Sequence, residues 1–239
     1  MSEQFSRTKL LLGEAALQKL AQSHVAVFGI GGVGGYAVEA LARSGVGKLD
    51  LIDNDTVALS NLNRQIIATH KTLGKYKVDV AAERIAEINP QCQVKTFKTF
   101  YLPDNKDEFN FKQYDYIIDA IDTVTGKIGL VMAANEAEIP IISAMGAGNK
   151  INPAAFEVAD IYQTSICPLA HIMRKELRRR GIERLKVVYS REKPIISRSA
   201  ITENTNGKMP PGSTAFVPPI VGMIMAGEVI KDLIDFNDE

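Results

Sequence analysis

The sequence predicts an α/β protein with a doubly wound, mostly parallel sheet and a smaller C-terminal α+β extension. Two observations lead to this fold class. In the first half of the chain, short apolar, β-branched runs alternate with longer segments of helical period, the pattern of a parallel sheet covered by helices on both faces. A glycine-rich turn follows the first of these runs, as in the nucleotide-binding folds of this class.

The composition is that of a globular protein. Of its 239 residues, 46% are hydrophobic and 23% are charged, and 28 basic side chains balance 28 acidic ones. These proportions exclude disordered, collagen-like and coiled-coil chains. The two cysteines, Cys92 and Cys167, belong to no CxxC pair, so we expect neither a disulfide framework nor a zinc site and place the protein in a reducing cytoplasm. The N-terminal apolar run is too short for a signal peptide.

Five strands and three helices are predicted before residue 150. In the second helix, Val78, Ala81, Ala82, Ile85 and Ile88 recur at spacings of three and four residues, so this face should pack on the sheet. The predicted strands are His24–Gly29, Lys48–Asp53, Val94–Thr99, Tyr114–Ala120 and Pro140–Ala144, and the predicted helices are Val33–Ser44, Gly74–Asn89 and Thr125–Glu138.

The alternation weakens after Asn149. Residues 1–150 are therefore expected to form the core and residues 151–239 an extension packed on it. A membrane span is not expected in the last apolar segment, Ala215–Ile234, because prolines and charges interrupt it before about 20 apolar residues are reached; a buried closing helix is predicted there. The other predicted elements are strands Ala155–Ile161 and Leu185–Ser190, helix Pro168–Arg180, and a long loop over Ser197–Ser213 that could lie over a substrate.

The glycine-rich turn has the geometry of a phosphate-binding loop. Gly29, Gly31 and Gly34 form a GxGxxG motif between a strand and a helix, and Gly32 lies within it. Glycines let the backbone approach a polyphosphate, and the helix N-terminus offers free N–H groups. Asp53 ends the next strand and can accept hydrogen bonds from ribose hydroxyls. A bound nucleotide is therefore predicted.

Cationic side chains favour ATP over NAD as that nucleotide. Arg64 and Lys77 follow the second strand, on the side where the glycine loop would hold the phosphates. Hydride transfer has no use for these cations, whereas attack of a carboxylate on the α-phosphate of ATP places negative charge where they would stabilise it. Asp122, just past the strand YIIDAID, could hold Mg²⁺. Asp119 is the competing choice, but its place inside the strand favours a structural hydrogen bond.

Five elements taken in order resemble the ubiquitin-activating-like adenylyltransferases. They are the glycine loop, Asp53-x-Asp55, Asn61-x-Asn63-Arg64-Gln65, Lys77 and Asp119-Ala-Ile-Asp122. The resemblance implies an ATP-binding doubly wound fold, a homodimer and adenylation of a carboxylate. It also implies that Asp53 and Asp55 lie at the nucleotide, that Asn61, Arg64 and Lys77 bind the phosphates, and that Asp122 binds the metal.

Arg7 is matched more loosely, within FSRTKLLLG. In this family a cation from one subunit reaches the triphosphate bound to the other, so the resemblance implies this role for Arg7, with Lys9 as a rival.

Within this family the chain is similar to the bacterial tRNA threonylcarbamoyladenosine dehydratases. The likeness runs from GEAALQKLAQSHVAVFGIGGVGG to CPLAHIMRKELRRRGI. It implies a substrate tRNA that carries threonylcarbamoyladenosine beside the anticodon, whose carboxylate is activated by ATP and closed to a cyclic hydantoin. No enzyme nucleophile is needed, because the ureido nitrogen of the substrate can attack the activated acyl carbon.

A basic segment supports an RNA substrate independently of the resemblance. Nine Lys and Arg against three Glu lie between His171 and Lys193, a local charge of +6 that the rest of the neutral chain offsets with −6. Such asymmetry suggests a polyanion on one face. A solvated helix face is the alternative. We expect residues 151–239 to carry the RNA face and the dimer contacts.

Three other functions stay open. Activation of a carrier protein's C-terminal carboxylate would use the same chemistry, but relatives of that kind carry zinc-binding CxxC pairs or a catalytic cysteine domain. Cys167, beside Pro168, could form a thioester or receive sulfur from a relay protein. An NAD-dependent oxidoreductase and a noncatalytic nucleotide-binding scaffold are disfavoured, because neither needs the Arg, Lys and Asp set.

Overall fold

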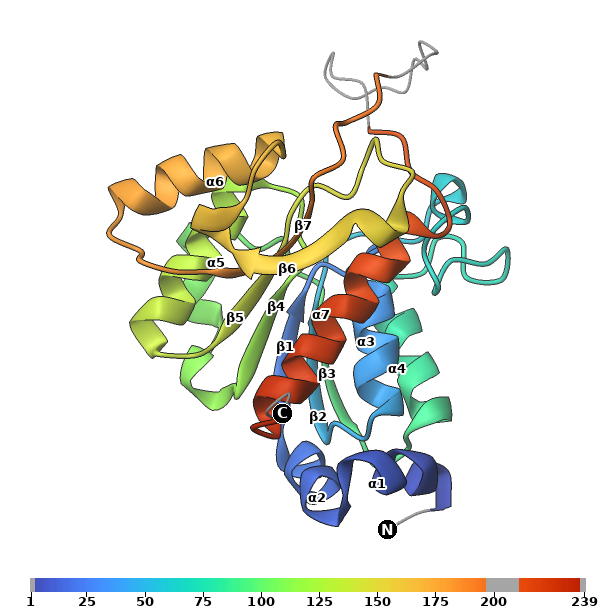
Figure 1. The fold of residues 1–239 in the computed structure, drawn as a ribbon. Helices are drawn as coiled ribbons and strands as arrows, with labels where there is room; N and C mark the ends of the chain where they lie inside the picture. Colours follow the sequence, from blue (N-terminus) through green and yellow to red (C-terminus); the bar gives the residue numbers. More distant parts are fainter. Residues whose placement is uncertain (1–2, 197–210, 237–239) are drawn as a thin grey trace.

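The computed structural model describes residues 3–196 and 211–236 and contains one seven-stranded sheet (Figure 1). The strands are β1 (His24–Phe28), β2 (Lys48–Ile52), β3 (Gln93–Phe97), β4 (Tyr116–Asp119), β5 (Ile141–Ala144), β6 (Phe156–Asp160) and β7 (Lys186–Ser190). Their order is β3-β2-β1-β4-β5-β7-β6. All neighbours are parallel except β6, which pairs antiparallel with β7. The predicted doubly wound, mostly parallel sheet is confirmed.

The strand order reverses at β1, which pairs with β2 on one side and with β4 on the other. In open α/β sheets, ligands bind at such a switch point, outside the carboxyl ends of the strands. The two strands predicted after residue 150 become β6 and β7 and continue the same sheet.

Helices cover both faces of the sheet. They are α1 (Ser6–Leu12), α2 (Glu14–Gln22), α3 (Gly34–Arg43), α4 (Lys77–Ile88), α5 (Val124–Ala137), α6 (Pro168–Arg179) and α7 (Val217–Leu233). Apolar residues of α3, α4 and α7 pack with one face of β1 and β2. On the other face, α5 packs with β1, β4 and an aromatic cluster, and α6 packs with α5 and β7. Short 3₁₀ turns lie at Glu3–Phe5, Leu59–Asn61, Pro103–Glu108, Phe111–Gln113, Pro153–Ala155 and Ile161–Gln163.

Three elements differ from the prediction. The sequence pattern did not indicate α1 and α2. Helix α4 begins at Lys77 rather than at Gly74, because Gly74 and Lys75 take part in a turn in which their N–H groups bond to Val57 and Thr72. Most of the predicted Ser197–Ser213 loop lies outside the described residues.

Helix α7 packs on the core as the predicted closing helix, but one apolar side of it is exposed. Val217, Val221 and Met225 are buried against α3 and the sheet. Ile220 and Met223, on the opposite side of the helix, are 38% and 42% exposed. Among the described residues, no helix combines the length and the apolar character that crossing a membrane requires.

Candidate active site

A cavity of about 710 Å³ lies at the carboxyl ends of the parallel strands. The loops that follow β1, β2, β4 and β5 meet there, together with the N-terminus of α6. Most of the predicted site residues line it. They are Gly29, Gly31, Gly32, Asp53, Asp55, Asn61, Arg64, Lys77 and Asp122.

The glycine loop combines close packing with an open backbone. Gly29 has a φ of +90°, and a Cβ there would lie 2.7 Å from the carbonyl oxygen of Ala120. A Cβ on Gly34 would lie 1.8 Å from the carbonyl oxygen of Gly29, so Gly34 serves the contact between α3 and β1 and does not line the cavity. At Gly31 the nearest atom would be 3.8 Å away, on the Gln65 side chain. The backbone at Gly31 can therefore be approached closely by a ligand.

Asp53 ties the glycine loop to the end of β2. Its Oδ2 accepts the N–H of Ile30 at 2.7 Å, and its Oδ1 accepts the N–H of Asp55 at 2.8 Å. Burial raises the pKa of Asp53, against the opposing charge of Lys77 and these backbone hydrogen bonds. Each carboxylate oxygen keeps a further lone pair for a ligand hydroxyl.

Lys77 is held at the cavity by Asp55. The Lys77 side chain is 7% exposed and its Nζ lies 2.6 Å from Oδ2 of Asp55, which is 61% exposed. The backbone N–H of Lys77 also donates to the carbonyl oxygen of Asp55 at 3.0 Å. The ammonium group is thus desolvated and fixed by a partner that is itself in contact with water.

The turn that contains Asn61 positions Arg64. Oδ1 of Asn61 accepts the N–H of Ala58 at 3.1 Å. The Arg64 guanidinium donates to the carbonyl oxygen of Ser60 at 3.0 Å and to Oδ1 of Asn63 at 2.9 Å. These contacts hold the guanidinium beside the glycine loop, where a Cβ on Gly32 would lie 3.3 Å from the Arg64 side chain.

The two candidate metal ligands after β4 have different surroundings. Asp119 is fully buried and accepts hydrogen bonds from Lys127, at 3.0 Å, and from Ser143. Asp122 is exposed and lines the cavity. Among the described residues, no group of three or more His, Cys, Asp or Glu side chains could hold a metal ion. Of the two candidates, Asp122 is therefore the carboxylate that a cation in the cavity can reach.

Arg7 lies away from this cavity within its own chain. It is exposed on α1, at the end of the sheet where the strands begin (Figure 1). There the Gln4 side chain donates to the carbonyl oxygen of Ile88 at 3.3 Å, and Phe5 packs against Gly45. Lys9, the rival candidate, forms an ion pair with Glu14. Neither cation lines the cavity of its own chain.

Sequence reasoning assigned no role in the site to several residues that line the cavity, among them Gln65, Tyr101 and Lys150, and considered Cys167 only as a reactive thiol. Gln65 and Tyr101 are buried, and the Oε1 of Gln65 and the hydroxyl of Tyr101 have no hydrogen-bond partner in the described part of the chain. Lys150 and Cys167 line the side formed by β5 and α6 and are also buried. Burial of Gln65 and Tyr101 without partners indicates that a polar ligand can complete their hydrogen bonding.

Comparisons with known proteins agree with this architecture. The tRNA threonylcarbamoyladenosine dehydratase of Bacillus subtilis is 44% identical over 243 residues, which cover 98% of this chain and 96% of that protein. A crystal structure of the E. coli tRNA N6-threonylcarbamoyladenosine dehydratase in complex with AMP has a TM-score of 0.89 and 36% identity, covering 98% of this chain and 94% of that one. The same enzyme in complex with ATP has a TM-score of 0.87 and 35% identity, with the same coverage. Residues 4–239 match the ThiF family, and the chain belongs to that family.

Proposed function

We propose that this protein is an ATP-dependent enzyme that dehydrates threonylcarbamoyladenosine in tRNA to its cyclic hydantoin form. The observation that carries the proposal is one cavity that unites the glycine loop, Asp53, Arg64, Lys77 and Asp122. The identity of the substrate is proposed from the relatives that are named for this reaction. A cytoplasmic location is part of the proposal, because the substrate tRNA is used there.

Three observations support ATP as the ligand of this cavity. Gly31 leaves the loop backbone open to the phosphates, Asp53 has lone pairs left for the ribose, and Gln65 and Tyr101 carry buried polar atoms without partners. Arg64 and Lys77 supply positive charge to the phosphates. Asp122 would hold Mg²⁺, which is usually bound by one or two carboxylates together with phosphate oxygens and water. When bound, the ion would neutralise part of the phosphate charge.

The chemistry follows from these positions. The substrate carboxylate attacks the α-phosphorus, pyrophosphate leaves, and an acyl-adenylate forms. Arg64 and Lys77 stabilise the charge that builds up on the phosphoryl oxygens. The ureido nitrogen attached to the adenine then attacks the acyl carbon, and AMP leaves with one of the carboxylate oxygens. The nitrogen loses its proton, so the nucleoside loses one water in total.

AMP release tests the proposal. The purified protein is incubated with MgATP and tRNA that carries threonylcarbamoyladenosine, and the same tRNA without the modification is the control. We expect AMP only with the modified tRNA, together with a nucleoside that has lost one water. No reaction with either tRNA would contradict the proposal and favour the carboxylate of a carrier protein as substrate.

Helix α6 is the surface proposed for RNA. On one side of this helix Met173 and Leu177 are buried, whereas its side chains Lys175, Arg178 and Arg179 are exposed. Arg174 has a structural role instead, because its guanidinium donates to Thr164, at 3.0 Å for the carbonyl oxygen. The exposed cations can therefore reach phosphates while the helix stays anchored.

Replacing Lys175 and Arg179 together by alanine should weaken tRNA binding and lower its salt dependence. Each phosphate contact contributes roughly 0.7–0.9 to the slope of log K against log salt, so the loss of two contacts should reduce the slope by about 1.5. Filter binding over a salt series measures it. The control is Lys48→Ala with Lys112→Ala, two exposed lysines that lie outside the basic segment from His171 to Lys193. Equal slopes for both double variants would argue against this surface.

A homodimer is proposed on the exposed apolar face of α7. Phe216, Ile220 and Met223 lie on one side of this helix and are exposed, and Leu10 and Leu11 beside Arg7 are exposed as well. Apolar patches of this kind mark protein contacts. A second subunit seated on α7 would cover them and could bring its α1 towards the nucleotide.

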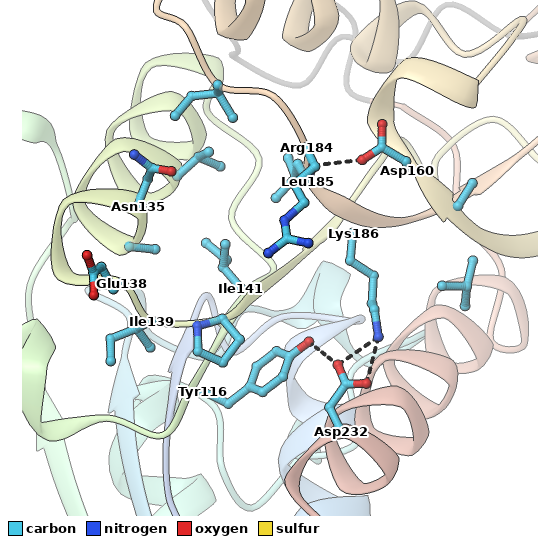
Figure 2. Close-up of a pocket in the computed structure, with 16 residues that line it drawn as sticks. Tyr116, Asn135, Glu138, Ile139, Ile141, Asp160, Arg184, Leu185, Lys186 and Asp232 are labelled. Carbon is cyan, nitrogen blue, oxygen red and sulfur yellow. Dashed lines mark hydrogen bonds and ion pairs between the residues drawn. The ribbon is translucent and has the colours of Figure 1, made fainter. Parts of the chain in front are cut away.

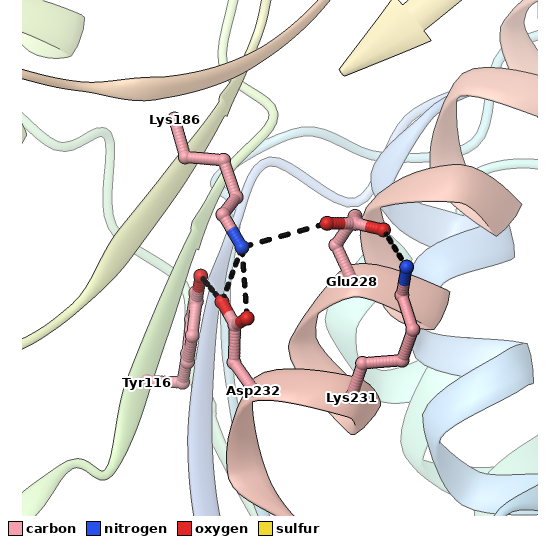
Figure 3. A network of polar contacts seen from close by, with 5 residues as sticks. All are labelled: Tyr116, Lys186, Glu228, Lys231 and Asp232. Atoms are coloured by element: carbon pink, nitrogen blue, oxygen red, sulfur yellow. Dashed lines mark hydrogen bonds and ion pairs between the residues drawn. The ribbon is translucent and has the colours of Figure 1, made fainter. Parts of the chain in front are cut away.

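A second cavity, of about 770 Å³, lies between α5, the start of β7 and the C-terminal end of α7 (Figure 2). It leaves part of β4 and β5 uncovered and is bordered by a polar network (Figure 3). There Lys186 donates to both oxygens of Asp232, at 2.7 and 2.8 Å, and the Tyr116 hydroxyl donates to the same carboxylate at 2.6 Å. The side chains of this cluster pair with one another and hold the C-terminal half of α7 against the sheet. The N-terminal half of α7, which carries the exposed Ile220 and Met223, is the part proposed to contact the partner.

Ile220→Asp should convert the dimer to monomers, because a carboxylate would be buried without a partner in the interface. Sedimentation velocity at micromolar concentration measures the change, and the control is Ile172→Asp, at an exposed isoleucine of α6. We expect a dimeric wild type, a dimeric control and a monomeric Ile220→Asp variant. A monomeric wild type would contradict the proposed interface.

A further inference from the structure

Lys150 is a buried cation at the end of the cavity away from the glycine loop. It is 4% exposed and belongs to the segment after β5, whereas the glycine loop and Lys77 follow β1 and β2. Because β4 lies between β1 and β5 in the sheet, the cavity has two separate ends. One carries the predicted phosphate-binding residues and the other carries Lys150 and Cys167.

The described chain provides no carboxylate partner for Lys150. Its Nζ lies 3.5 Å from the carbonyl oxygen of Ser190 and 5.7 Å from the centre of the Phe156 ring. The carboxylate of Glu192 instead accepts the N–H groups of Ile151 and Asn152, each at 3.0 Å. Burial lowers the pKa of Lys150, and the opposing influence of Cys167 and Glu192 does not compensate. A buried ammonium without an anion is costly, so an anionic ligand would be stabilising here.

A second feature of this end also favours an anion. Helix α6 has 12 residues and begins at Pro168, with Cys167 as its N-cap, and no side chain caps it. Cys167, Pro168 and Leu169 line the same cavity as Lys150. The first N–H groups of a helix have no partner within the helix, and the helix dipole favours negative charge at that position.

We propose that Lys150 and the N-terminus of α6 bind the substrate carboxylate before it attacks the α-phosphate. This inference rests on the proposed adenylation, and it places the acceptor at the β5 end of the cavity and ATP at the β1 end. Lys150 then selects substrates that carry a negative charge at the reacting group and holds the attacking oxygen in the cavity. The alternative is that Lys150 only links the segment after β5 to β7 through Ser190.

The test compares two probes, the nucleoside threonylcarbamoyladenosine and its methyl ester, which lacks the negative charge. Binding to the AMP-saturated protein is measured by calorimetry for the wild type, Lys150→Met, Lys150→Arg and the control Lys112→Met, an exposed lysine in a turn far along the chain from β5. We expect the wild type and Lys112→Met to prefer the acid by about tenfold or more. Lys150→Met should lose this preference but bind AMP within about twofold of wild type, and Lys150→Arg should regain part of it.

Two outcomes would overturn the role of Lys150. If the wild type binds the acid and the methyl ester equally, the protein has no carboxylate site. If Lys150→Met keeps the preference for the acid, the role of Lys150 is structural, whatever the melting temperature of the variant. The tRNA turnover of the wild type is measured in parallel. Turnover of the wild type with an unchanged preference in Lys150→Met would remove the Lys150 assignment alone, whereas absence of turnover would remove the proposed function.

Discussion

Replacing Lys77 by methionine should reduce kcat/KM for AMP formation by about 10²–10³, because a fixed positive charge at the reacting phosphoryl group is lost. The fold should survive, since the partner of Lys77, Asp55, is 61% exposed and water can solvate its carboxylate. Rates are measured with modified tRNA and MgATP, and melting temperatures are measured alongside.

Lys75→Met is the matched control for Lys77→Met. Lys75 lies two residues earlier, is exposed and forms a 3.6 Å surface pair with Glu83. It should keep wild-type activity. If Lys77→Met retained more than a tenth of the activity, the assignment of Lys77 to the phosphates would be wrong.

Replacing Gly34 by alanine should destabilise the fold by more than about 3 kcal/mol, the range reached by severe steric conflicts. The new Cβ would lie 1.8 Å from the carbonyl oxygen of Gly29, so the start of α3 would have to separate from the end of β1. Urea denaturation followed by circular dichroism measures the loss. A chain that does not fold at all is the same result in its extreme form.

Gly31→Ala, compared with Gly34→Ala, distinguishes a glycine that leaves room for a ligand from a glycine that is needed for packing within the same loop. Its Cβ would meet no atom closer than 3.8 Å, so the free energy of unfolding should change by less than about 1 kcal/mol. The affinity for ATP should fall, because the methyl group would face the phosphates. A stable Gly34→Ala variant, or a Gly31→Ala variant as unstable as Gly34→Ala, would contradict the division of roles between these glycines.

Most of the sheet was predictable because the central parallel strands β1, β4 and β5 are short, largely buried apolar runs between turn residues. Helix α1 was not, because it exposes Leu10 and Leu11 and so lacks the one-sided apolar pattern that indicates a helix packed on a core. The face of α7 that carries Ile220 and Met223 could not be predicted as exposed either, because an apolar helix face has the same pattern whether a core or a second subunit covers it.

The candidate site was predictable where its residues directly follow strands. Asp53 and Asp122 follow β2 and β4, and parallel strands bring their carboxyl ends to one edge. Lys150 also follows a strand, yet its signal is burial without a partner, which appears only when β7 and α6 are placed around it. The role expected of Arg7 comes only from the resemblance, because no described element of its own chain brings Arg7 to the cavity.

The most direct test of the central claim follows one oxygen atom. The carboxylate of threonylcarbamoyladenosine in tRNA is labelled with oxygen-18, and the products of a single turnover with MgATP are analysed by mass spectrometry. Carboxylate adenylation predicts one labelled oxygen in AMP, unlabelled pyrophosphate and a cyclic nucleoside that has lost one water. Labelled inorganic phosphate formed together with ADP would show attack at the γ-phosphate and contradict the account.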